Sequence, residues 1–323
     1  MCKYTGLQCN ESPAVTDFMK SDDQGKESAD PTQRLPDYAE GLDRFHQAFF
    51  EELRAVIARL PLAAGMKILD IGCGDGFYTR MLAERLSSVN DSASGRGGEV
   101  VGIDNNPDFL AVARRRCESA AATSPRISPC RFVQNDLDRL AGEGPTYDLV
   151  WCAQSLYSFP EPVAALKRIA AVLKPGGRVI VLENDTNHQL LLPWPMESEL
   201  IIRAAEFAAL TAESKRPSKF YVGRRLPAVL AESGLEDVAA QTQAIDRAAP
   251  LDSPLAAFLQ SYLERLAERI TPHLDPCHIA AVLDLLSPES DRYLLRRPHF
   301  MCTWINVIAC GRKPGTASEP RAT

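Results

Sequence analysis

Hydrophobic residues follow a helical period in some segments of this chain and form short continuous runs in others. Over residues 38–60 they recur at steps of three and four, which predicts one amphipathic helix that Pro61 ends. The run at 68–71 is short and apolar, as in a buried strand, and residues 77–86 again favour a helix. The central region therefore begins with a strand that leads directly into a helix.

The C-terminal part of the chain returns to helical patterns. Ser253 at the N-cap and Pro254 at the first turn predict the start of a long amphipathic helix. Asp275-Pro276 repeats this opening for a shorter one. Together with the helices at 38–60 and 196–211, these helices are expected either to cap a substrate cleft or to thicken the core. The predicted elements in this part are helices at 196–211, 223–233 and within 253–286, and strands at 235–244 and 300–310.

Glycine occupies every second position of the turn that follows the first predicted strand. Gly72, Gly74 and Gly76 allow a sharp turn and a close approach to a ligand, where a Cβ would collide. Asp70, at the end of the strand, would repel a pyrophosphate but suits a cationic ligand. Phe77 stands where the dinucleotide motif G-x-G-x-x-G has its third glycine. The turn therefore predicts a nucleotide-type crevice but disfavours an NAD-dependent dehydrogenase.

The D-x-G-x-G-x-G arrangement resembles motif I of the class I S-adenosylmethionine (SAM)-dependent methyltransferases. Four further segments are similar to motifs of that family and follow in the same order: 100–104, 132–137, 147–156 and 173–181. The resemblance covers residues 67–183. It implies an α/β fold with a Rossmann-like seven-stranded sheet, mostly parallel, with helices on both faces, an antiparallel last strand and helical cap insertions.

The same resemblance implies SAM as cofactor and implies its contacts residue by residue. Asp70 and the glycines of the turn would surround the methionine end, and Asp104 would bind both ribose hydroxyls. Asp136 and Leu137 would frame the adenine. The complete set of predicted cofactor-binding residues is Asp70, Gly72, Cys73, Gly74, Gly76, Asp104, Asn105, Asp136, Leu137, Gln154 and Ser155.

Three residues are candidates for a catalytic role. His188 follows the fifth strand on the side of the crevice, and an imidazole with a pKa near 6.5 can take a hydroxyl proton at neutral pH. A histidine on a surface loop is the alternative interpretation. His46 lies on or beside the apolar face of the first helix, where a histidine is more often a packed core residue. Tyr157 directly follows the fourth motif and is expected to line the substrate pocket.

Composition and charge narrow the class of acceptor. The net charge of −6 disfavours a nucleic-acid partner, because binding phosphates requires a basic surface. The segment 153–156 also lacks the [D/N/S]-P-P-[Y/F] pattern of methyltransferases that act on DNA amino groups. The predicted partner is therefore a small-molecule acceptor. His273, Cys277 and His278 fit no standard metal-binding spacing, so no metal site is predicted.

The predicted location is the cytoplasm. The chain has no apolar run of 18 residues, so no membrane span is expected, and its N-terminus lacks the pattern of a secretory signal. Nine cysteines without a CxxC pair are typical of reduced thiols.

The chain divides into four predicted segments. A flexible polar tail spans 1–36, and the SAM-binding core with its N-terminal helix spans 37–185. The C-terminal part of the fold with the cap spans 186–312, and a second flexible tail spans 313–323. The predicted function is SAM-dependent methyl transfer to a small organic acceptor, with oxygen favoured because of His188. A protein or RNA acceptor and a catalytically silent SAM-binding scaffold are the alternatives, and the sequence predicts no oligomeric state.

Overall fold

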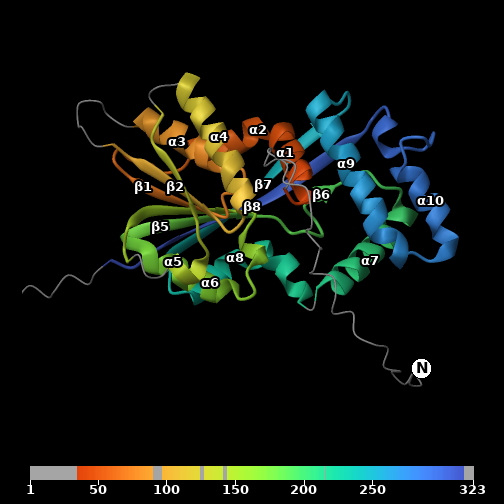
Figure 1. Ribbon diagram of the computed structural model, residues 1–323. Helices are drawn as coiled ribbons and strands as arrows, with labels where there is room; N and C mark the ends of the chain where they lie inside the picture. The colour runs from red at the N-terminus through yellow and green to blue at the C-terminus, as the bar shows by residue number, and fades with distance from the viewer. Residues whose placement is uncertain (1–34, 90–96, 124–126, 141–143, 215, 316–323) are drawn as a thin grey trace, which may run out of the picture.

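The computed structural model describes five stretches of the chain, which are residues 35–89, 97–123, 127–140, 144–214 and 216–315. The predicted tails, 1–36 and 313–323, fall mostly outside the described residues. The described residues form one mixed sheet with helices on both faces and a further group of helices beside it (Figure 1).

The strands lie in the order β3-β2-β1-β4-β5-β8-β6, and β7 pairs with β8 from its other side. Strands β1 to β5 run parallel, whereas β8 is antiparallel to β5, β6 and β7. The mostly parallel sheet with an antiparallel last strand is thus confirmed, and the short β6 adds an eighth strand to the predicted seven. The strands are β1 Lys67–Ile71, β2 Glu99–Asp104, β3 Cys130–Gln134, β4 Tyr147–Ala153, β5 Leu173–Glu183, β6 Leu190–Leu191, β7 Glu236–Ala248 and β8 Met301–Arg312.

Both faces of the sheet are buried, each in its own apolar core. Side chains alternate along a strand, so Ile68 and Ile180 join one core while Leu69 and Val179 join the other. Helices α1 to α4 lie on one side of the sheet, and α5, α6 and α8 lie on the other (Figure 1). This double cover explains why the strands are continuous apolar runs.

The helices and 3-10 turns complete the fold. The α-helices are α1 Tyr38–Ala48, α2 Phe50–Ala58, α3 Phe77–Val89, α4 Pro107–Thr123, α5 Leu137–Leu140, α6 Pro162–Val172, α7 Met196–Glu213, α8 Val222–Glu232, α9 Ser253–Ile270 and α10 Pro276–Leu286. The 3-10 turns are η3 Leu156–Ser158, η4 Pro217–Tyr221, η5 Thr271–His273 and η6 Leu294–Arg296. None of the described helices combines the length and the apolar character that crossing a membrane requires.

Two local predictions were wrong. The predicted single helix over 38–60 is two helices, because Phe49 leaves helical geometry with φ −118° and ψ 20°. Its side chain is fully buried, so the apolar period continues through the break and cannot reveal it. At the start of α9 the cap is Asp252 and not Ser253, since its Oδ1 accepts a hydrogen bond from the Leu255 N–H at 2.9 Å.

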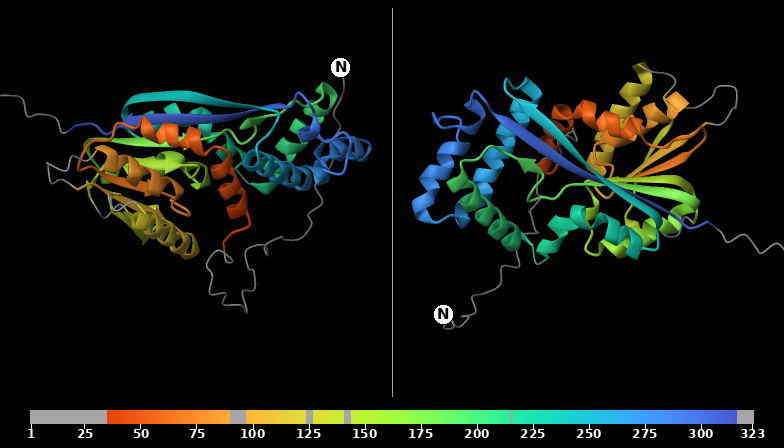
Figure 2. Two further views of the ribbon diagram at one scale, coloured as in Figure 1. Left: turned by 90° about the horizontal axis from the view of Figure 1, so that it is seen from above. Right: turned by 180° about the vertical axis from the view of Figure 1, so that it is seen from behind.

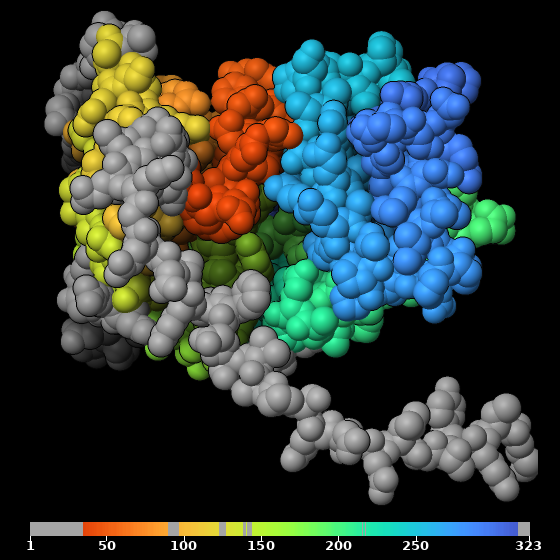
Figure 3. Space-filling model, turned by 45° about the vertical axis from the view of Figure 1, so that its right-hand side comes forward, coloured from red at the N-terminus to blue at the C-terminus, as the bar shows by residue number. Residues whose placement is uncertain are grey.

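Helices α1, α7 and α9 gather beyond the carboxyl ends of the parallel strands (Figure 2). The break at Phe49 sets α1 against α9, and the two helices lie side by side on the surface (Figure 3). Phe45 of α1 packs between Phe258 of α9 and Trp304 of β8, at ring-centroid distances of 5.9 and 4.7 Å. These aromatic contacts attach α1 to the helical group.

Candidate functional site

The turn between β1 and α3 has the left-handed geometry that its glycines predict. Gly72, Gly74 and Gly76 have φ values of 65°, 51° and 79°, which L side chains rarely adopt. A Cβ built on Gly74 would meet no atom within 4 Å, so this part of the turn faces open space. The turn is attached to the next strand, because the Cys73 N–H donates to the Ile103 carbonyl at 2.9 Å.

A cavity of about 350 Å³, here called the glycine-turn cavity, lies against this turn. It is lined by the turn and by residues at the carboxyl ends of β2, β3 and β4, as expected at this edge of an open parallel sheet. The structure brings most of the predicted cofactor-binding residues together here. Those that line it are Gly72, Cys73, Gly74, Asp104, Asn105, Asp136, Leu137, Gln154 and Ser155, and the catalytic candidates Tyr157 and His46 line it too.

Asp104, at the end of β2, is held by two backbone donors. Its Oδ2 accepts from the Gly74 N–H at 3.0 Å, and its Oδ1 accepts from the Asn106 N–H at 2.9 Å. A carboxylate oxygen has a second lone pair, so each can accept one more hydrogen bond from a ligand. The carboxylate is therefore oriented for a pair of hydroxyl groups.

Asp70 and Gly76 are not among the residues that line this cavity. The Asp70 side chain is 1% exposed and accepts a hydrogen bond from Thr79 Oγ1 at 2.6 Å. Its burial raises the pKa of Asp70 to about 7. A Cβ on Gly76 would lie 2.9 Å from the Ala113 Cβ, so this glycine lets α4 pack closely against the turn. Both residues therefore support the turn on the side that faces away from the cavity.

A second cavity of about 960 Å³, here called the cap cavity, lies between α1, α7 and α9. Part of its wall is apolar and aromatic, including Phe45, Phe258 and Trp304. Four residues line both cavities, namely Tyr38, Leu42, Gln154 and Tyr157. The two cavities are therefore neighbours with a shared wall.

Gln154, just after β4, belongs to that shared wall and has an unusual conformation. Its φ of 50° lies in the left-handed region that non-glycine residues seldom occupy. Its side-chain Oε1 is buried and has no hydrogen-bond partner among the described residues. Strained backbone and an unpaired buried acceptor both concentrate at functional sites, so Gln154 is well placed to accept a hydrogen bond from a ligand.

Glu183 is a site residue that the sequence analysis did not predict. It ends β5, is 1% exposed and lines the cap cavity. Its Oε1 accepts from the backbone N–H groups of Leu156 and Tyr157, at 2.6 and 3.2 Å. Burial raises the pKa of Glu183 to about 8. This carboxyl group holds the segment that carries Tyr157 in place. The position of Glu183 at the end of a strand was the one feature of the sequence that could have indicated a site residue.

A second unpredicted group connects α1 to the glycine turn. Arg116 of α4 forms an ion pair with Asp75 in the turn and another with Asp43 of α1, the latter at 2.9 Å. Asp75 is buried, and burial raises its pKa against the opposing effect of Arg116. The bridge ties the helix over the cavity to the loop that forms its floor.

His46 is packed rather than solvated. It is 4% exposed, and its ring stacks on Phe77 with a centroid distance of 3.8 Å and an interplanar angle of 3°. Neither ring nitrogen has a hydrogen-bond partner among the described residues. Burial lowers the pKa of His46 to about 3, so the ring is neutral at physiological pH. Its position fits both the packing and the ligand-contact interpretation.

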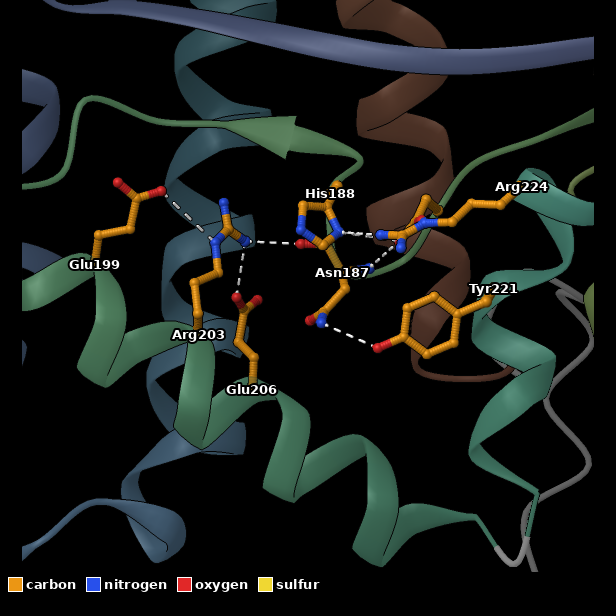
Figure 4. A network of polar contacts seen from close by, with 8 residues as sticks. Asn187, His188, Glu199, Arg203, Glu206, Tyr221 and Arg224 are labelled. Carbon is orange, nitrogen blue, oxygen red and sulfur yellow. Dashed lines mark hydrogen bonds and ion pairs between the residues drawn. The ribbon is translucent and has the colours of Figure 1, made fainter.

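His188 lies on the loop after β5 (Figure 4). It is not among the residues that line either cavity, although Thr186 and Gln189 of the same loop line the cap cavity. Its side chain is 49% exposed, and its Nδ1 lies 2.6 Å from Arg224 Nη2 and 3.3 Å from Asp185 Oδ1. On the adjoining side, Arg203 of α7 donates to the Asn187 carbonyl at 2.8 Å. These contacts hold the loop between α7 and α8, and they do not bring the imidazole to a cavity wall.

The sequence predicted that His273, Cys277 and His278 do not form a metal site. Across the residues that the structure describes, no group of three or more His, Cys, Asp or Glu side chains is arranged to hold a metal ion.

Residues 62–234 match a family model described as a methyltransferase domain. Among similar proteins, the ubiquinone biosynthesis O-methyltransferase of Aliivibrio fischeri is 34% identical over 116 residues, which are 36% of this chain and 42% of the relative. The trans-aconitate 2-methyltransferase of Methylobacterium nodulans is 31% identical over 169 residues, which are 51% of this chain and 57% of the relative. The chain thus spans about half the length of these relatives.

A demethylmenaquinone methyltransferase of Lactococcus lactis is 31% identical over 145 residues, or 45% of this chain and 52% of the relative. Among solved structures, a SAM-dependent methyltransferase from Thiobacillus denitrificans in complex with S-adenosylhomocysteine is 20% identical, with a TM-score of 0.45. The match covers 85% of this chain and 98% of that one.

Proposed function

The chain belongs to the class I SAM-dependent methyltransferase family, and from this premise we propose that it transfers a methyl group to a small organic acceptor. The observation that carries the proposal is the shared wall of the two cavities. Tyr38, Leu42, Gln154 and Tyr157 line both the glycine-turn cavity and the cap cavity. A donor in the first cavity and an acceptor in the second would meet at these residues, shielded from water.

The residues of the glycine-turn cavity fit SAM. The Asp104 carboxylate has a free lone pair on each oxygen for the two ribose hydroxyls, and the open space at Gly74 admits a ligand next to the backbone. SAM, when bound, supplies a methyl group that its sulfonium sulfur has already activated. The protein then has to bind and orient the two substrates and to exclude water from them. The roles given to Asp104 and Gly74 are part of this proposal.

The cap cavity favours a small acceptor with an apolar or aromatic skeleton. Phe45, Phe258 and Trp304 supply aromatic surface, and α1 and α9 close over it. We favour oxygen as the acceptor atom, because the relative from Aliivibrio fischeri is an O-methyltransferase. His188 does not line the cap cavity, so its position gives this choice no support. We further propose that the chain works in the cytoplasm, on the evidence of its cysteine content.

Titration calorimetry with SAM, S-adenosylhomocysteine and NAD tests the cofactor. We expect dissociation constants in the micromolar range for the first two ligands and no heat from NAD. Transfer from tritiated SAM into three separated fractions of a cell extract, small molecules, protein and RNA, then tests the acceptor. Label in the small-molecule fraction is expected. Label confined to protein or RNA would contradict the acceptor class, and tight NAD binding without SAM binding would contradict the function.

A further inference from the structure

Helix α9 presents a stripe of basic residues to the cap cavity. Arg265 and Arg269 are four residues apart and therefore lie on the same face of the helix, and His273 of η5 continues that line. All three line the cap cavity, whose wall also carries the aromatic residues described above. The stripe adds hydrogen-bond donors to a wall that also carries the acidic residues Glu183, Glu213 and Glu268.

Arg265 has no hydrogen bond or ion pair to any of the residues that the structure describes. Most other arginines of the described ranges donate to a carboxylate or a carbonyl, as Arg269 does to Glu206. Two acidic residues, Glu264 and Glu268, are close to Arg265 in sequence on α9, yet no ion pair forms with either. The Arg265 guanidinium, which can donate five hydrogen bonds in a planar fork, is thus unpaired in this part of the chain.

Gly41 of α1 forms a seat for that guanidinium. It is buried at the end of the first turn of α1, and glycine within a helix costs up to about 1 kcal/mol relative to alanine. A Cβ built on Gly41 would overlap the Arg265 guanidinium, so the guanidinium can occupy its present position against α1 only while residue 41 is glycine. The neighbouring Leu42 lines both cavities, which places the seat beside the wall they share.

Arg269 adds a second unsatisfied donor to the same stripe. Its Nη2 forms an ion pair with Glu206 at 3.3 Å, but Glu206 also forms an ion pair with Arg203 at 3.0 Å. The Arg269 Nε is buried and has no partner among the described residues. Buried donors are normally satisfied, so a missing acceptor is expected at this side of the cavity.

We propose that the acceptor is an organic anion, whose apolar or aromatic skeleton fills the cap cavity while Arg265 binds its carboxylate or another anionic oxygen group. Guanidinium groups bind such oxygens in bidentate geometry, and Arg265 is exposed, so its donors are accessible to a ligand. Among the described residues, three carboxyl groups line this cavity. Burial raises the pKa of Glu183 to about 8, which favours its neutral form, whereas Glu213 and Glu268 are exposed, so that solvent and salt screen their charges. The inference rests on the proposed function, since it assigns the substrate class of the same site.

Calorimetry on the protein saturated with S-adenosylhomocysteine tests the proposal. The probes are 4-hydroxycinnamate and decanoate, each compared with its primary amide, which has the same shape but no charge. We expect at least one acid to bind ten-fold or more tightly than its amide. Arg265→Gln should remove this preference, and Arg265→Lys should keep part of it because lysine retains the charge without the fork.

Two further variants separate recognition from folding. Gly41→Ala should fold with unchanged or higher thermal stability yet lose most of the preference for acids, because the flexible guanidinium is displaced from its seat. Arg225→Gln is the matched control, since Arg225 also forms no hydrogen bond or ion pair with the described residues but lines a different cavity, beside α8.

Equal affinity for acids and amides, failure of both acids to bind, or an unchanged preference in Arg265→Gln would overturn the proposal. Binding of S-adenosylhomocysteine is measured separately. If that ligand fails to bind the unmodified protein, the proposed function itself is contradicted; if it binds and the acids do not, only the assignment of the acceptor class is.

Discussion

Replacing Asp104 by alanine should weaken cofactor binding by a predictable amount. The substitution removes the acceptor for both ribose hydroxyls, and a hydrogen bond to a charged group contributes about 1.5–3 kcal/mol. It also frees the Gly74 and Asn106 N–H groups that now orient the carboxylate. Allowing for water that replaces part of these interactions, we expect a loss of about 2–4 kcal/mol, or about 30- to 1,000-fold in affinity for S-adenosylhomocysteine.

Asp104→Asn refines this prediction. The amide oxygen can accept one of the two backbone N–H groups, but the amide nitrogen would face the other as a second donor. We expect roughly half the free-energy loss of the alanine variant. Asp246→Ala is the control, since Asp246 on β7 accepts from Thr303 Oγ1 and lies outside both cavities.

Titration calorimetry gives the affinities, and circular dichroism with thermal unfolding shows whether each variant is folded. A folded Asp104→Ala protein that binds S-adenosylhomocysteine within three-fold of the unmodified chain would refute the reasoning, because the ribose would then be bound elsewhere.

Three further substitutions test separate parts of the account. Gly74→Val should abolish binding of S-adenosylhomocysteine, because its side chain projects into the glycine-turn cavity at φ 51°, whereas the core change Ile180→Val should not; calorimetry on folded protein decides. The pKa of Glu183 is about 8 in the folded chain against an ordinary 4.5, so the folded chain keeps this proton to a higher pH than the unfolded chain does. The free energy of unfolding should therefore fall by up to roughly 4–5 kcal/mol between pH 4.5 and 8. Denaturant titrations of Glu183→Gln should show a shallower fall; an unchanged slope would contradict the burial argument. His188→Ala should change the turnover number less than about three-fold, since the ring lies outside both cavities, whereas a lost general base would cost 10²–10⁴-fold.

The sheet and the glycine turn could be predicted because their sequence signals are local. A parallel strand covered on both faces must be a continuous apolar run, and a turn with positive φ at three positions demands glycine. Once these elements are placed, the carboxyl ends of β1 to β4 meet at one edge, so Asp104 and Gln154 come to line one cavity although they are 50 positions apart in the sequence.

Features that depend on packing between distant segments could not be predicted. The break at Phe49 cannot be seen in the sequence, because the apolar period runs through it. The position of Arg265 depends on the packing of Gly41 of α1 against α9, which the sequence does not reveal. The loop after β5 illustrates the same limit. Its direction is determined by Arg203 and Arg224 from two later helices, so a position near the crevice in sequence did not bring His188 to a cavity wall.

The central claim is that a cofactor in the glycine-turn cavity meets an acceptor in the cap cavity at Gln154 and Tyr157. A crystal structure of the complex with S-adenosylhomocysteine tests it most directly. We expect the ribose hydroxyls to be bound by Asp104, the homocysteine part to lie against the backbone at Gly74, and the sulfur to face the wall that the two cavities share. A ligand bound elsewhere, or one whose sulfur faces away from that wall, would contradict the account.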